Sequence, residues 1–167
     1  TTLHQLFAVL DDDQVEIEVE IRPEAEFGRS LELEGLVPVQ LLLNPEELPP
    51  DRKWRLRMLA EDFRLDPWLK LANIANTPVI GSQGTAEAVI EFTGLNPVMV
   101  QTQVDIEQLV LAQPSGEPAV YDSFAGSLSW QRQQQGWRAE GNNLRLDSGG
   151  RRWPESQFTV EYNAVSA

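Results

Sequence analysis

Residues 15–22 read Val15-Glu16-Ile17-Glu18-Val19-Glu20-Ile21-Arg22, so hydrophobic and charged side chains alternate at every step. Successive side chains of a β-strand point to opposite faces, and this period of two therefore predicts a strand with one apolar and one charged face. The charged face must remain in contact with water. The segment consequently belongs to an antiparallel sheet that is covered on one face and open on the other.

The same alternation recurs on the C-terminal side of this stretch. It is present in residues 30–34, 54–58, 86–92 and 98–106. In the last third of the chain, alternating segments at 124–130, 137–146 and 158–162 are separated by short stretches rich in Gln, Gly and Ser. Short turns between alternating segments predict a three-stranded antiparallel meander in this region.

Helical signals are few. Asp66 is suited to the N-cap, Pro67 to the first helical position, and Trp68 begins an apolar stripe, which predicts one short helix near 66–74. Residues 3–10 have apolar spacing that fits a helix and an apolar strand equally well. We therefore expect very little helix to cover the sheet.

Proline-rich stretches at 44–50 and 114–118 divide the chain into segments of about 1–50, 51–113 and 119–167. None of these segments has enough strands to build a closed core alone. We therefore interpret residues 1–167 as one unit. The predicted fold class is mainly β, an extended, curled antiparallel sheet that is half-barrel or groove-like.

The composition excludes several classes of protein. The chain has 167 residues with 26 acidic and 13 basic side chains, a net charge of -13, one His and no Cys. So few clustered bases argue against nucleic acid as a partner, and the absence of Cys removes disulfides and thiolate metal sites. No apolar stretch is long enough to cross a bilayer as a helix. Because the chain does not begin with Met, we expect it to be a piece of a longer protein.

The sequence contains only weak signals for catalytic or metal-binding sites. His4 has no nucleophile motif to serve, and residues 11–13 (Asp-Asp-Asp) lack the spacing of a calcium-binding loop. The simplest explanation of the row Glu16, Glu18 and Glu20 is that it forms the solvated face of a strand. Residues 81–84 (Gly-Ser-Gln-Gly) lack the lysine of a phosphate-binding loop. We therefore expect no enzymatic activity, no metal site and no cofactor.

Five tryptophans could stack on sugars, but four of them lie in or beside predicted strands, where sheet packing explains them. The stronger feature is the apolar face itself. A sheet that offers one continuous apolar face with little helix must close into a barrel, pair with another sheet, or curl around a ligand.

Motifs in the C-terminal third resemble a known family. The segments are Phe124-Ala125-Gly126-Ser127-Leu128-Ser129-Trp130, Gly136-Trp137-Arg138-Ala139-Glu140-Gly141, Leu144-Arg145-Leu146 and Arg151-Arg152-Trp153-Pro154-Glu155-Ser156. They are similar to the meander of the YhdP-like branch of the AsmA-like envelope proteins. The Asp66-Pro67-Trp68-Leu69 turn is similar to that family's D-x-x-PWL element.

The resemblance implies a location and a function. Such proteins are long, are anchored in the inner membrane of Gram-negative bacteria, and extend through the periplasm. They are similar to bridge-like lipid transfer proteins, in which a curled sheet forms a hydrophobic groove that conducts phospholipids towards the outer membrane. This chain would be one periplasmic segment of such a groove, without the membrane anchor. Its partners would be acyl chains, neighbouring segments of the same chain and other envelope proteins.

We expect the following residues to line an apolar groove: Val15, Ile17, Val19, Ile21, Ala88, Ile90, Val100 and Val104. The glutamate-bearing face would point outward into water. An alternative is a β-rich scaffold or interaction module whose sheet edges pair with neighbouring segments or with another envelope protein. Apolar surface along the concave face favours lipid, whereas apolar surface at strand edges favours pairing.

Overall fold

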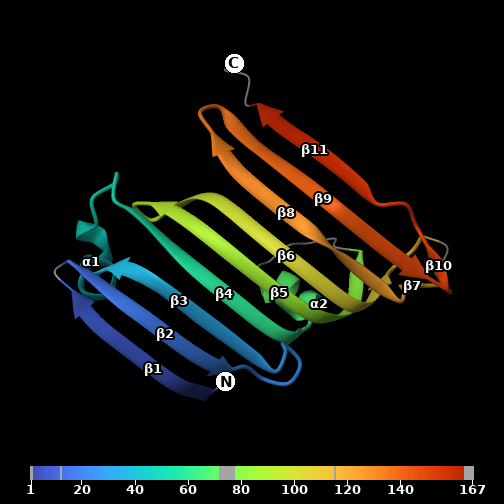
Figure 1. The fold of residues 1–167 in the computed structure, drawn as a ribbon, viewed down its shortest axis with the longest axis horizontal. Helices are drawn as coiled ribbons and strands as arrows, with labels where there is room; N and C mark the ends of the chain where they lie inside the picture. Colours follow the sequence, from blue (N-terminus) through green and yellow to red (C-terminus); the bar gives the residue numbers. More distant parts are fainter. Residues whose placement is uncertain (1, 12, 72–77, 115, 164–167) are drawn as a thin grey trace.

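The computed structural model describes residues 2–11, 13–71, 78–114 and 116–163, which form one 11-stranded antiparallel sheet. The strand order is β1-β2-β3-β4-β5-β6-β8-β9-β10, while β7 pairs with β6 and β11 pairs with β9. In Figure 1 the strands follow one another from β1 at the lower left to β11 at the upper right, and the sheet does not close. The predicted extended, curled antiparallel sheet is confirmed.

Consecutive strands pair along almost the whole order. Their bounds are β1 Thr2–Asp11, β2 Gln14–Arg22, β3 Ser30–Pro38, β4 Lys53–Phe63, β5 Val79–Thr93, β6 Asn96–Leu111, β7 Ala119–Tyr121, β8 Ser123–Gln133, β9 Gly136–Ser148, β10 Arg151–Arg152 and β11 Ser156–Asn163. The helices are α1 (Val39–Leu43), the 3-10 helix η1 (Pro45–Glu47) and α2 (Leu65–Leu71). Each alternating segment of the sequence lies in one of these strands.

The structure decides the segment that fitted a helix and a strand equally well, and it describes the first part of the expected helix. Residues 3–10 lie in β1, which pairs with β2 from Thr2 opposite Arg22 to Asp11 opposite Gln14. The helix expected near 66–74 is α2, and residues 72–77 lie outside the described ones. It begins at Leu65, one residue before the expected N-cap, because the Leu65 N–H donates to the hydroxyl of Ser82 at 2.6 Å. The neighbouring strand thus takes the role expected of the Asp66 side chain.

Helix α1 was not expected from the sequence. Its residues, Val39-Gln40-Leu41-Leu42-Leu43, lack a helical spacing of polar and apolar side chains. Pro38 occupies the N-cap, and the Val39 N–H donates to the carbonyl of Asp13 at 3.0 Å. In Figure 1, α1 lies at one end of the strands, whereas α2 lies towards the other end, against β5.

Local irregularities interrupt several ladders of the sheet. In β4 the register shifts between Ala60 and Phe63, and Asp62 adopts a left-handed conformation with φ 48°. A second shift lies between Ala125 and Ser127 of β8, opposite Asn143 with φ 54°. Such bulges insert an extra residue into one strand and increase its twist and bend. They supply part of the curvature of the sheet.

Few of the residues whose burial the structure describes have buried side chains. The buried hydrophobic residues are Val15, Val37, Leu48, Ala60, Ala86, Ala88 and Ile106. Most apolar side chains of the strands are only partly buried, because no second layer covers the described part of the sheet. An ordinary domain buries a sheet face against another layer, and this one leaves much of it uncovered.

Candidate functional site

Directly paired residues of an antiparallel sheet point to the same face, so the register assigns every strand residue to a face. One row of directly paired residues crosses eight strands: Val19, Leu33, Met58, Ala88, Thr102, Leu128, Gly141 and Phe158. Beside it runs a second row: Ile17, Gly35, Leu56, Ile90, Val100, Trp130, Ala139 and Val160. We call the face that carries these rows the apolar face. At about 4.8 Å per strand it extends for roughly 34 Å.

All eight residues expected to line a groove lie on the apolar face. Val19 and Ala88 belong to the first row, and Ile17, Ile90 and Val100 to the second. A third, shorter row contains Ile21 and Val104, joined through Leu31, Ala60 and Ala86, and Val15 pairs directly with Val37. The structure therefore brings these residues together on one surface, while contact with acyl chains stays a prediction.

The list of expected residues was too short. On β3 and β4 it omitted Leu33, Leu56 and Met58, which join the two groups of expected residues. It also omitted the C-terminal strands, where Leu128 and Trp130 continue the two rows. The same alternation of apolar and polar side chains would have identified them, because each omitted residue lies in a segment with period two.

Helix α2 covers one end of the apolar face. The Trp68 ring packs edge-on against Phe27 with 5.3 Å between centroids, and it lies 6.3 Å from the ring of Phe63. Its Nε1–H donates to the carbonyl of Phe27 at 3.0 Å. Ala60, Ala86 and Ile106, at the same end, are among the few buried residues. The helix therefore closes one end of the face and leaves its middle open.

Aromatic side chains gather at the margin formed by β9 and β11. Trp137 stacks on Tyr162 with 5.9 Å between centroids, and the Phe158 ring lies over Gly141, where a Cβ would overlap it. Phe158 remains 43% exposed and Tyr162 52% exposed. An aromatic ring laid over a glycine shields the backbone that a bare glycine leaves uncovered. The apolar face thus ends at an uncovered aromatic margin.

The opposite face, which we call the polar face, carries the charges. Its central row runs through Glu18, Glu34, Arg57, Val89, Gln101, Ser129, Glu140 and Thr159. Arg57 bridges three strands: its Nη1 lies 3.0 Å from Glu34 and its Nε 2.8 Å from Glu87. Both carboxylates raise the pKa of Arg57, chiefly through the hydrogen bond to Glu87. At this point ion pairs join β3, β4 and β5.

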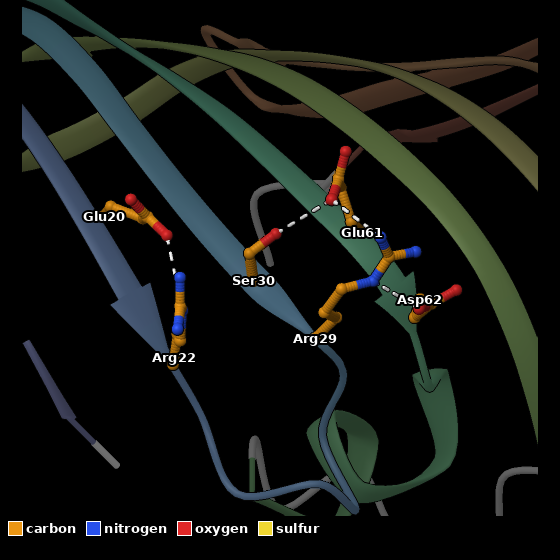
Figure 2. Close-up of polar contacts among 6 residues, drawn as sticks. All are labelled: Glu20, Arg22, Arg29, Ser30, Glu61 and Asp62. Carbon is orange, nitrogen blue, oxygen red and sulfur yellow. Dashed lines mark hydrogen bonds and ion pairs between the residues drawn. The ribbon is translucent and has the colours of Figure 1, made fainter. Parts of the chain in front are cut away.

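A cluster of polar contacts surrounds the bulge of β4 (Figure 2). The Arg29 Nε donates to Asp62 at 2.6 Å, and the Ser30 hydroxyl donates to Glu61 at 3.2 Å. The hydrogen bond from Arg29 holds the pKa of Asp62 below its ordinary value. Glu20 and Arg22 form a separate, longer ion pair of 3.5 Å on β2. The cluster ties the β2–β3 connection to the bulge rather than forming a cavity for catalysis.

A similar contact stabilises the turn between β9 and β10. Arg152 lies 3.0 Å from Asp147, which also accepts a hydrogen bond from the Ser123 hydroxyl at 3.0 Å. These hydrogen bonds lower the pKa of Asp147, with that from Arg152 contributing most. The exposed polar contacts are therefore explained by strand and turn geometry.

The described residues contain no group of three or more His, Cys, Asp or Glu side chains arranged to hold a metal ion. His4 lies at a register shift of β1, between Leu3 and Gln5. Among the tryptophans, Trp153 is strongly exposed, at 55%, whereas the other four are partly buried. Sugar binding by several exposed tryptophans on one surface therefore has no support in this arrangement.

The described helices are all too short or too polar to span a bilayer. No protein-family model, curated protein or solved structure matches this chain. The resemblance to the AsmA-like envelope proteins therefore stays a prediction from the C-terminal motifs. The feature of the molecule that bears most directly on function is the apolar face.

Proposed function

We propose that this chain is a non-enzymatic, periplasmic segment of a hydrophobic groove that carries phospholipid acyl chains between the membranes of Gram-negative bacteria. The observation that supports it is the apolar face, a surface of aligned hydrophobic rows whose middle is not covered by a second layer in the described part of the chain. The motif resemblance supplies the envelope location and the kind of lipid. On this proposal, phospholipid acyl chains take the place of the missing second layer.

The energetics favour an apolar occupant. Transfer of apolar surface out of water contributes about 25 cal/mol per Å², or roughly 0.8 kcal/mol for each methylene. Large contiguous apolar patches are rare on monomeric soluble proteins and mark interaction surfaces. An acyl chain has no hydrogen-bonding groups, which matches rows of aliphatic side chains whose backbone groups are already used in the sheet. A polar ligand would gain little on this face.

Two adjacent residues of β5 provide a matched test. Ile90 lies on the apolar face and Val89 on the polar face, and both are partly buried in the central part of the sheet. We expect Ile90→Glu to reduce binding of a fluorescent phospholipid to the purified chain by about tenfold or more, because an ionised carboxylate on the acyl path must be desolvated. Val89→Glu should leave binding close to that of the parent chain.

Circular dichroism of both variants controls for loss of fold. Equal lipid binding by folded Ile90→Glu and Val89→Glu would contradict the proposal, as would the absence of lipid binding by the parent chain. Both variants add one carboxylate to the same strand. A difference in lipid binding between them therefore reports which face of the sheet carries the charge and not a change in net charge.

A specific observation favours edge pairing as a second candidate. All residues of the margin strand β11 are exposed, including Val160 at 47%. An exposed strand edge with apolar side chains is a template for pairing with another strand. This function predicts association through β11 and no lipid binding, so the phospholipid measurement distinguishes the two candidates.

A further inference from the structure

The polar face carries three exposed apolar side chains that a groove on the opposite face does not use. Phe7 is 51% exposed, Val9 43% and Leu36 50%. The register places them among charges, because Phe7 lies opposite Glu18 and Leu36 opposite Arg55. Neighbouring exposed apolar side chains that are surrounded by polar residues are typical of surfaces that contact another protein.

Two of these side chains, Phe7 and Leu36, border a hollow in the polar face. It has a volume of about 680 Å³, and its apolar lining includes Phe7, Leu36 and Val89. Four glutamates and two arginines also line it. Hollows of a few hundred Å³ with mixed apolar and polar lining are of the size that binds small ligands and short peptide segments. The hollow is acidic, because its carboxylates outnumber its guanidinium groups.

The carboxylates of this region are poorly compensated within the described part of the chain. Glu18 lies directly opposite Glu34, and Glu20 lies directly opposite Glu32. Like charges directly opposite each other destabilise a sheet. Arg57 is already engaged by Glu34 and Glu87, and neither Glu16 nor Glu18 has an ion pair with another described residue. A cationic occupant would relieve this repulsion.

We propose that the hollow between Phe7 and Val89 docks a polypeptide segment in which lysine or arginine alternates with apolar residues. The basic side chains pair with Glu16 and Glu18, and the apolar ones contact Phe7 and Leu36. A polypeptide fits better than a metal ion, because the described carboxylates do not converge into a metal-binding group. The side chains proposed to bind the peptide lie on the polar face, opposite the lipid groove, although the lining of the hollow also includes Ile17 and Gly35 of the second row.

A binding measurement with synthetic peptides tests the proposal. The probe is a short labelled peptide of alternating lysine and leucine, and its reference is a peptide in which serine replaces leucine. We expect the double variant Glu16→Gln, Glu18→Gln to bind the probe roughly tenfold more weakly than the parent chain. The matched double variant Glu46→Gln, Glu47→Gln removes the same charge from exposed residues of η1 and should bind normally.

A second pair of variants tests the apolar contacts. Leu36→Ser should weaken binding of the lysine and leucine probe, whereas Leu42→Ser, at an exposed residue of α1 outside the hollow, should not. The proposal is overturned if the two double variants bind equally, or if the serine peptide binds as tightly as the leucine peptide. A calcium titration that stabilises the parent chain but not Glu16→Gln, Glu18→Gln would assign the carboxylates to a metal ion and would also overturn it.

Discussion

At the scale of single residues, the clearest electrostatic feature is the contact that holds the β4 bulge. Asp62 adopts a left-handed backbone conformation that is uncommon outside glycine, and Arg29 binds its carboxylate from the start of β3. The backbone reinforces this contact, because the Arg29 N–H donates to the Glu61 carbonyl at 2.9 Å. One arginine therefore stabilises both the side chain and the backbone of the bulge.

This contact makes the stability of the fold depend on pH. The pKa of Asp62 is lowered in the folded chain, so its contribution is fully present above the ordinary aspartate value of about 3.9 and is lost as pH falls below it. We expect Arg29→Gln to lower the melting temperature at neutral pH. It should also flatten the decline in melting temperature below about pH 4, as followed by circular dichroism.

The control is Arg22→Gln, which removes the same charge but only the longer ion pair with Glu20 (Figure 2). It should retain the steeper acid-induced decline of the parent chain. If both variants and the parent chain lose stability in parallel below pH 4, the Asp62 carboxylate does not carry the pH dependence assigned to it.

At the scale of elements, two glycines of β5 differ in how much space the neighbouring strand leaves for a side chain. A Cβ at Gly84 would overlap the backbone carbonyl of Asp105 on β6, whereas a Cβ at Gly81 would meet Val110 at an ordinary 3.5 Å. We expect Gly84→Ala to destabilise the chain by about 1–3 kcal/mol, because the backbone of the neighbouring strand can move away from the new Cβ only by distorting the sheet. Gly81→Ala should change stability by no more than about 0.5 kcal/mol.

Urea unfolding of both variants measures this difference. Because β5 and β6 form the most extensive strand pair of the sheet, a forced separation at Gly84 should also loosen the ladder towards Ile106. Equal unfolding free energies for the two variants would mean that β6 yields easily and that the close approach of the strands at Gly84 is not important for the fold.

The same elements show which features were predictable from the sequence. The alternation in residues 15–22 identified β2 and both of its faces, because period two is a direct consequence of strand geometry. Helix α2 was identified by Pro67, although the hydroxyl of Ser82 moved its start to Leu65. Helix α1 had no such signal, since its boundary depends on Pro38 and on a contact from Asp13 in another hairpin.

The apolar face was predictable and the hollow in the polar face was not. Each expected groove residue follows from alternation within a single strand. By contrast, Leu36 and Phe7 come from separate strands, and their proximity depends on the register of β1, β2 and β3. Register is set by pairing and bulges, which the local pattern of one strand does not specify.

At the scale of the whole molecule, the sheet separates two surfaces with different chemistry. One surface has rows of aliphatic and aromatic residues across eight strands, and the other has carboxylates, guanidinium groups and amides. A single-layer sheet of this extent leaves apolar area uncovered that an ordinary domain would bury. On the proposed function, acyl chains occupy the apolar face, and lipid contact therefore occurs on one face only.

Photo-crosslinking along β6 tests this claim most directly. A benzophenone amino acid is placed in turn at each position from 100 to 106, and the purified chain is irradiated with vesicles of phosphatidylethanolamine and phosphatidylglycerol. We expect phospholipid adducts by mass spectrometry to alternate with period two, at Val100, Thr102 and Val104 but not at Gln101, Gln103 or Asp105, whereas Ile106, which is buried at the end covered by α2, should give none. Adducts of equal yield on both sets of positions, or no adducts at any of them, would contradict the account.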